Sequence, residues 1–218
     1  MKHLPNALTL LRLVLAPIVA WLFWSAFQVE TAASGLARVS ETATMQATLA
    51  AVLFVVAALT DLFDGMIARA FNYHSKFGRI IDPIADKALV GLPLIAITIV
   101  AAASALPEWP YIATATAVIV LRDIAMTVIR FMSPDGEGVR VSSLAKWKTA
   151  LELVVVGSFL GVAAMETQLI AGGSLGLWAD LAEPFRWTWL GLLLITAALS
   201  AWTAFQYLRP ANPPSETQ

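Results

Sequence analysis

Six apolar stretches recur along the 218-residue chain, and they constrain its fold more than any other feature. Each is about 20 residues long, enough to cross the hydrocarbon core of a bilayer as one helix. Lipid offers no hydrogen bonds to a backbone, so each stretch must satisfy its own amide groups as an α-helix. The expected spans are roughly 6–28, 46–71, 81–104, 109–131, 147–170 and 184–207. The sequence therefore predicts an all-α integral membrane protein with six transmembrane helices.

The polar residues are too few for an ordinary soluble domain. Charged residues make up 13% of the chain and hydrophobic residues 59%, whereas soluble domains carry about 25% charged residues. The net charge of −1 gives no basic field for nucleic acid, so no nucleic-acid partner is expected. The absence of cysteine excludes disulfides and thiol chemistry. We expect one membrane domain over 1–210 and a disordered tail over 211–218, while loops 28–45 and 171–186 carry no readable signal.

Basic residues predict the orientation of the helices. With six spans, both termini and two loops share one side, and that side holds twelve of the fourteen lysines and arginines. The opposite side holds only Arg38 and Arg186. Because basic residues favour the cytoplasmic side, we expect both termini to face the cytoplasm. The expected location is the inner (cytoplasmic) membrane.

Four aspartates interrupt the apolar sequence between the second and third spans. Asp61 and Asp64 lie three residues apart at the end of one helix, and Asp82 and Asp86 lie four apart at the start of the next. Residues at these spacings share a helix face. A short linker joins the helices, so they are expected to be antiparallel neighbours whose four carboxylates converge on one cavity, open to the cytoplasm.

Bare carboxylates at membrane depth are unfavourable, by about 3 kcal/mol each on insertion scales. Proton sharing, pairing with Arg69, Arg79 or Lys87, and binding of divalent cations would each relieve this cost. Hard oxygen ligands on rigid helices fit Mg²⁺ or Mn²⁺, and two ions could share four carboxylates.

Small residues beside the aspartates indicate an open groove. Gly65 and Ala68 leave one helix surface bare, and Gly78 lies where the linker enters the next helix. The guanidinium fork of Arg69 suits a phosphate group. Metals, groove and arginine together suggest a diphosphate substrate.

The aspartate segment has the form D-x2-D-G-x2-A-R-x8-G-x3-D-x3-D, and it resembles the signature of the CDP-alcohol phosphotransferases without a gap or substitution. The resemblance implies a six-helix membrane enzyme, usually a homodimer, in which an acceptor alcohol displaces CMP from a CDP-linked lipid. It also implies that Asp61, Asp64, Asp82 and Asp86 hold two divalent ions, Mg²⁺ or Mn²⁺. Asp86 would in addition be the general base.

The same resemblance suggests contacts to the substrate CDP-diacylglycerol. Positions that touch the nucleotide diphosphate, or open the groove around it, fall on Gly65, Ala68, Arg69, Ser75 and Gly78. The N-terminal stretch LPNALTLLRLVLAPIV resembles the opening of the phosphatidylglycerophosphate synthase subfamily, and it would place Asn6 and Thr9 near the CDP group. Pro5-Asn6 also fits a plain helix start.

A subfamily of this kind uses glycerol 3-phosphate, an anionic acceptor that needs a basic pocket beside the metals. Candidates for that pocket are Arg122, Arg130, Lys146 and Lys148. For the two lysines, the alternative is that they only flank the cytoplasmic ends of membrane helices, as basic residues commonly do. Asp123 and Glu152 are the alternative partners for Arg122.

Other functions stay open at this stage. The signature does not separate glycerol 3-phosphate from phosphatidylglycerol (as in cardiolipin synthesis), serine or an inositol phosphate. A divalent-cation or proton transporter would also use membrane aspartates, but its polar residues should continue across the membrane. The outer halves of the second and third spans are apolar, which favours an enzyme with a one-sided site.

Overall fold

The computed structural model describes residues 4–28, 40–71, 76–132, 143–172 and 176–208; the expected tail lies outside them. Within these ranges, only the backbone is described for 4–6, 62–71, 76–80, 130, 143–146, 176–179 and 208. The described residues form the helices α1 (Leu4–Ala26), α2 (Glu41–Phe71), α3 (Lys76–Ala103), α4 (Trp109–Met132), α5 (Ser143–Ala171) and α6 (Gly176–Leu208). Each contains a segment long and apolar enough to span a membrane. The predicted all-α, six-helix membrane fold is confirmed.

Several helices extend beyond the predicted apolar stretches into polar residues. α2 begins at Glu41, where the hydroxyl of Ser40 accepts a hydrogen bond from the amide of Ala43 at 3.1 Å. This is an N-cap, which satisfies one of the orphan amides of the first turn. α6 begins at Gly176 and continues through Pro184 into its apolar part.

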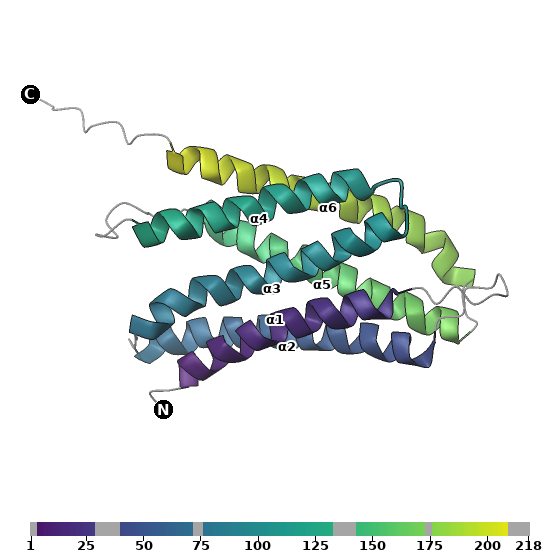
Figure 1. Ribbon diagram of the computed structural model, residues 1–218, viewed down its shortest axis with the longest axis horizontal. Helices are drawn as coiled ribbons and strands as arrows, with labels where there is room; N and C mark the ends of the chain where they lie inside the picture. Colours follow the sequence, from purple (N-terminus) through teal and green to yellow (C-terminus); the bar gives the residue numbers. More distant parts are fainter. Residues whose placement is uncertain (1–3, 29–39, 72–75, 133–142, 173–175, 209–218) are drawn as a thin grey trace, which may run out of the picture.

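The helices form a ring of packed neighbours. α1 packs against α2 and α3; α2 packs against α5, α5 against α6, α6 against α4, and α4 against α3. α1 begins and α6 ends at the same end of the molecule, on the left of Figure 1. α2 and α3 are antiparallel, as predicted, but α1 mediates most of their packing, and their direct contact is small.

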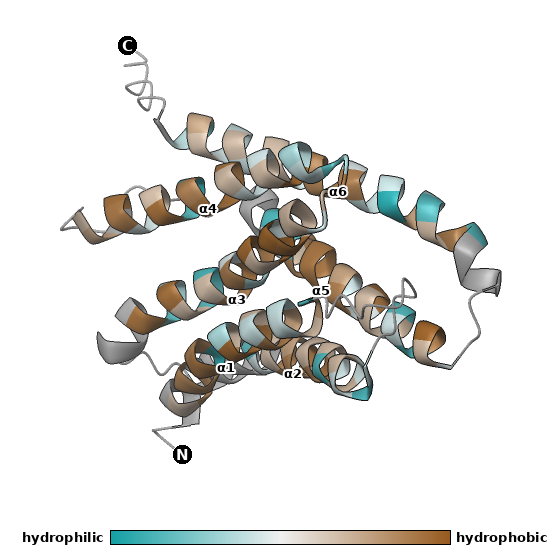
Figure 2. Ribbon diagram, turned by 45° about the vertical axis from the view of Figure 1, so that its right-hand side comes forward, coloured by the Kyte–Doolittle hydropathy of each residue, from teal (hydrophilic) through white to brown (hydrophobic). Residues whose placement is uncertain are grey.

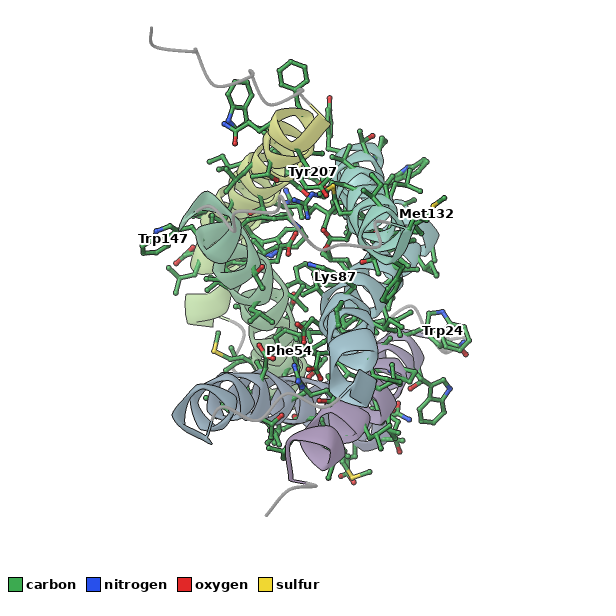
Figure 3. All side chains as sticks on the ribbon, turned by 90° about the vertical axis from the view of Figure 1, so that its left-hand side faces the viewer. Trp24, Phe54, Lys87, Met132, Trp147 and Tyr207 are labelled. Atoms are coloured by element: carbon green, nitrogen blue, oxygen red, sulfur yellow. The ribbon has the colours of Figure 1, made fainter. Side chains whose placement is uncertain are left out.

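Apolar side chains from several helices form the core of the ring, and its outer surface suits lipid. Val19 of α1, Phe54 of α2, Leu94 and Ile97 of α3 and Leu193 of α6 are almost fully buried. Figure 2 shows hydrophobic residues along most of each helix, with hydrophilic residues in short patches. The large side chains labelled on the periphery of Figure 3, among them Trp24, Met132 and Trp147, are exposed.

A tight turn joins α3 to α4. The amide of Leu106 donates to the carbonyl of Ala101, and that of Ala105 donates to Ala102, both at 3.1 Å. Ala105 has a positive φ of 50°. These are the two bonds and the left-handed residue of a Schellman cap. The cap fixes Glu108, whose carbonyl accepts from the amide of Ile112 in the first turn of α4.

Candidate active site

Three carboxylates meet at the end of the molecule where α1 begins. Asp61 comes from α2, Asp82 and Asp86 come from the start of α3, and α1 contributes Thr9 and Arg12. One guanidinium nitrogen, Nη1 of Arg12, donates to Oδ1 of Asp61 and, at 2.5 Å, to Oδ1 of Asp86. The hydroxyl of Thr9 donates to Oδ1 of Asp82 at 2.6 Å. We call these five residues the aspartate cluster.

Exposure differs sharply within this cluster. The Arg12 side chain is 2% exposed, whereas the side chains of Asp61 and Asp86 are 33% and 38% exposed. The arginine is therefore sealed inside the helix ring, and the carboxylates lie at the edge of its interior. A ligand can reach the acids without displacing the arginine from its buried position.

The donor set fits a hard divalent cation. Carboxylate oxygens from two helices already converge on a single positively charged nitrogen. Three carboxylates outnumber the one guanidinium beside them, and oxygen ligands of this kind are those that Mg²⁺ and Mn²⁺ prefer. No group of three acidic, histidine or cysteine residues is arranged as a complete metal site among the described side chains. The fourth predicted ligand, Asp64, has only its backbone described.

Most of the predicted CDP contacts lie near the end of α2 or at the start of α3. Gly65, Ala68 and Arg69 lie in the last turns of α2, and Gly78 lies in the first turn of α3, with only their backbones described. The same is true of three further predicted residues, Asn6 in α1, Arg130 in α4 and Lys146 in α5. Ser75 lies outside the described residues. Thr9 is the one predicted CDP contact whose side chain the structure places, and it lies in the aspartate cluster.

A second polar cluster lies where α3, α4 and α5 meet. Asp123 is at its centre: its Oδ1 lies 2.6 Å from Nζ of Lys148 and 2.9 Å from Nη1 of Arg122, and its Oδ2 lies 3.0 Å from Nζ of Lys87. Lys148 also forms an ion pair of 2.7 Å with Glu152. We call these five residues the Asp123 cluster. Figure 3 shows Lys87 pointing into the interior between α3 and α5.

Two candidates for the acceptor pocket, Arg122 and Lys148, have described side chains, and they differ in exposure and in ion pairing. Lys148 is 1% exposed and forms ion pairs with two carboxylates, those of Asp123 and Glu152. Its positive charge is therefore already compensated. Arg122 is more open, at 14% side-chain exposure, and its Nη2 donates to Thr203 at 3.0 Å. Asp123 is a partner of Arg122, as the sequence allowed, whereas Glu152 pairs with Lys148.

Sequence reasoning missed the role of Arg12. It treated this residue only as one of the basic residues on the cytoplasmic side. The available signal was an arginine inside an apolar stretch, because such a residue needs a carboxylate or a polar cavity at the same depth. Lys87 was a candidate partner for the cluster aspartates; its ion pair is with Asp123 instead.

Known proteins resemble this chain over most of its length. The sequence profile of the family described as CDP-alcohol phosphatidyltransferase matches residues 2–202. A CDP-diacylglycerol–glycerol-3-phosphate 3-phosphatidyltransferase of Cereibacter sphaeroides is 33% identical over 96% of this chain and 96% of its own length. The protein of the same name in Escherichia coli K12 is 28% identical, over 96% of this chain and 95% of its own. An Arabidopsis thaliana protein of that name, numbered 2, is 33% identical over 72% of this chain and 64% of its own length.

Proposed function

The chain belongs to the CDP-alcohol phosphatidyltransferase family, and from that premise we propose that it transfers the phosphatidyl group of CDP-diacylglycerol to glycerol 3-phosphate. The products are CMP and phosphatidylglycerophosphate, so the reaction is a step of phospholipid synthesis. Relatives named for this reaction align with nearly the whole chain, which supports both the enzyme class and the two substrates. The structural observation that carries the proposal is the convergence of Asp61, Asp82 and Asp86 at one end of a six-helix membrane fold.

Asp61, Asp64, Asp82 and Asp86 would hold two divalent ions, Mg²⁺ or Mn²⁺. Bound there, the ions would supply electrostatic stabilisation of the diphosphate and of the leaving CMP. The excess of carboxylates over guanidinium in the aspartate cluster supports this assignment. Thr9 and Arg12 would act as positioning residues, because each donates a hydrogen bond that fixes the direction of a carboxylate.

Asp86 would be the general base. Its side chain is 38% exposed, so an acceptor hydroxyl can approach it. The carboxylate would take the proton of the glycerol hydroxyl as that oxygen attacks the β-phosphorus of CDP-diacylglycerol. The new bond joins the glycerol oxygen to this phosphorus, and the bond from the phosphorus to the CMP oxygen breaks. Asn6, Gly65, Ala68, Arg69, Ser75 and Gly78 would hold the nucleotide diphosphate.

The phosphate of the acceptor would bind beside Arg122, with Arg130, Lys146 and Lys148 adding positive charge. The Asp123 cluster supports this, because its three cations exceed its two acids and Arg122 is partly exposed. Lys148 would act mainly by holding Asp123 in place. Lys87 follows Asp86 in α3 and reaches Asp123, so it links the two clusters.

The chain is a multi-pass membrane protein, and we place it in the inner (cytoplasmic) membrane as a homodimer with its active site facing the cytoplasm. The twelve-to-two distribution of basic residues supports this orientation. The chain has no cysteine, so single cysteines at Ser40 and Gln206 can be labelled in sealed vesicles. They should react from opposite sides, and reaction from one side would refute the topology. Native mass measurement of the purified complex tests the dimer.

The activity is tested with purified protein, CDP-diacylglycerol, Mn²⁺ and a panel of acceptors, by following the release of CMP. Glycerol 3-phosphate should be the best acceptor, and chelation of the metal should stop the reaction. Faster turnover with serine, an inositol phosphate or phosphatidylglycerol would keep the family and overturn this acceptor. Metal or proton flux across vesicles without CMP release would favour the transporter.

A further inference from the structure

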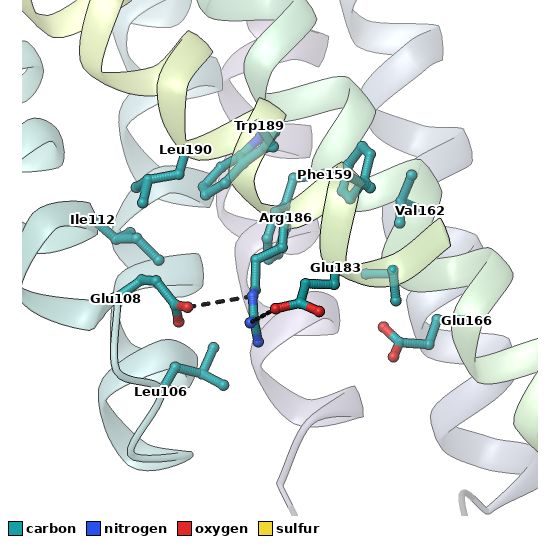
Figure 4. A pocket seen from close by; sticks show the side chains of 13 residues that line it. Leu106, Glu108, Ile112, Phe159, Val162, Glu166, Glu183, Arg186, Trp189 and Leu190 are labelled. Carbon is teal, nitrogen blue, oxygen red and sulfur yellow. Dashed lines mark ion pairs between the residues drawn. The ribbon is translucent and has the colours of Figure 1, made fainter. Parts of the chain in front are cut away.

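The end of the molecule opposite the aspartate cluster contains a cavity of about 510 Å³. Its walls come from the start of α4, the end of α5 and the start of α6 (Figure 4). The apolar part of the lining includes Leu106, Ile112, Phe159, Val162 and Leu190. This cavity is remote from the aspartates, so the transfer reaction does not account for it.

Three carboxylates and one guanidinium also line the cavity: Glu108, Glu166, Glu183 and Arg186. Nε of Arg186 lies 3.3 Å from Oε1 of Glu108, and its Nη2 lies 3.8 Å from Oε1 of Glu183. Figure 4 shows the guanidinium between these two acids. The acids therefore outnumber the cation, and the site favours a positively charged ligand.

Glu108 gives the second and independent indication of a ligand. The residue is 4% exposed, and its Oε2 has no hydrogen-bond donor among the described residues. A buried carboxylate oxygen without a donor is destabilising, typically by about 1–3 kcal/mol or more. The Schellman cap of α3 and the first turn of α4 hold Glu108 at this position. The fold thus fixes one carboxylate oxygen, Oε2 of Glu108, that has no hydrogen-bond donor among the described residues, at the edge of a cavity large enough to hold a ligand.

The depth of the cavity indicates where its ligand comes from. Trp109, Tyr111 and Trp187 directly neighbour lining residues in the sequence, and all three are exposed. Trp109 also lies at the end of a predicted membrane span. Exposed tryptophan and tyrosine at the end of a span mark the level of the lipid head groups. The cavity therefore lies where a head group and the upper part of its acyl chains meet the protein.

We propose that this cavity binds a zwitterionic lipid whose head group carries a primary ammonium, from the leaflet opposite the aspartate cluster. The ammonium donates to Oε2 of Glu108 and lies near Glu166, the lipid phosphate accepts from Arg186, and the acyl chains lie along the apolar wall. A quaternary ammonium has no N–H to donate, and an anionic head group meets an excess of carboxylates. The site therefore selects phosphatidylethanolamine over phosphatidylcholine and phosphatidylglycerol.

The test is a binding titration of the full-length protein in detergent by native mass spectrometry, with dioleoyl-phosphatidylethanolamine and dioleoyl-phosphatidylcholine as probes. The wild type should bind the ethanolamine lipid about tenfold more tightly, as expected for one charge-assisted hydrogen bond. Glu108→Gln should abolish most of this preference. Glu41→Gln is the matched control, because Glu41 is an exposed carboxylate at the same end and lies outside the cavity.

A second variant keeps every charge. Ala182 lines the cavity and is half-buried, so Ala182→Leu narrows it without removing a polar group. This variant should weaken binding of the ethanolamine lipid while CMP release stays at the wild-type rate. Equal affinity of the wild type for the two lipids would overturn the proposal, as would loss of preference in Glu41→Gln. Glycerophosphoethanolamine, which has no acyl chains, should compete poorly; competition at the same concentration as the lipid would exclude a lipid ligand.

Discussion

The aspartate cluster and the Asp123 cluster lie within one helix ring, yet they handle charge in opposite ways. In the aspartate cluster, three carboxylates face one guanidinium, and the acids at its edge are about one-third exposed. In the Asp123 cluster, three cations face two carboxylates, and both carboxylates are at most 6% exposed. Buried charge is tolerated when it is paired and is costly when it is not.

The difference indicates a division of labour. The Asp123 cluster has most of its partners within the protein, so it resembles a structural ion-pair network with a small positive surplus. The aspartate cluster has an exposed negative surplus, which a structural network would not retain. We infer that the negative surplus of the aspartate cluster binds cations. The positive surplus of the Asp123 cluster would bind the phosphate of the acceptor. Lys87, the residue after Asp86 in α3, joins the two clusters through its ion pair with Asp123.

Replacing Asp86, the proposed general base, should have the largest effect. Asp86→Asn should lower CMP release by about 10²–10⁴-fold, the usual contribution of a positioned base. The amide keeps the shape of the side chain and one oxygen, so binding of CDP-diacylglycerol should change little. The measurements are the turnover rate and nucleotide binding. Near-normal turnover would remove Asp86 from the mechanism.

Lys148 tests whether the Asp123 cluster is structural. Lys148→Met should destabilise the protein by about 3–5 kcal/mol, because it leaves buried Asp123 and Glu152 short of a cation. Denaturant unfolding in detergent measures this. The double variant with Glu152→Gln should recover part of the loss. Unchanged stability in Lys148→Met would show that the charge is not held by these partners.

Arg122 tests the positive surplus of the same cluster. Arg122→Ala should raise the KM for glycerol 3-phosphate roughly tenfold to a hundredfold, since a charge-assisted contact contributes about 1.5–3 kcal/mol. The KM for CDP-diacylglycerol should change far less. Arg186→Ala, at the opposite end of the molecule, is the control. Equal increases of both KM values would argue for a general structural effect.

The smallest effect is expected at Lys87. Its side chain is 28% exposed, whereas that of Lys148 is 2% exposed, although both pair with Asp123. Lys87→Met should therefore lower stability by about 1 kcal/mol or less, because a partly exposed pair contributes little and Asp123 keeps two other cations. The same unfolding experiment gives the comparison. A loss as large as that of Lys148→Met would contradict the ranking.

The sequence predicted the six helices well, because the bilayer imposes one solution on each apolar stretch. It also predicted that aspartates of α2 and α3 converge, since helical spacing and a short linker dictate this. It did not predict that α1 lies against both helices and supplies Arg12. Contact between helices distant in sequence depends on side-chain packing, which periodicity alone does not specify.

The cavity beside Glu108 and Arg186 was equally beyond sequence reasoning. Part of its lining falls in a segment that showed no readable pattern: Ala182, Glu183, Phe185 and Arg186. Glu108 and Arg186 are 78 positions apart, and only the crossing of α4 and α6 brings them together. Lys148 is a further example: the sequence offered an acceptor contact or a flanking cation, whereas the structure buries the side chain in an ion pair with Asp123.

Binding of Mn²⁺, followed by electron paramagnetic resonance, tests the central contrast most directly, because it does not depend on turnover. The wild type should bind two ions per chain, and Asp61→Asn and Asp82→Asn should each weaken that binding strongly. The Glu152→Gln variant should bind Mn²⁺ as the wild type does, because Glu152 belongs to the Asp123 cluster and its carboxylate pairs with Lys148. Failure of the wild type to bind Mn²⁺, or an equal loss in Glu152→Gln, would contradict the account.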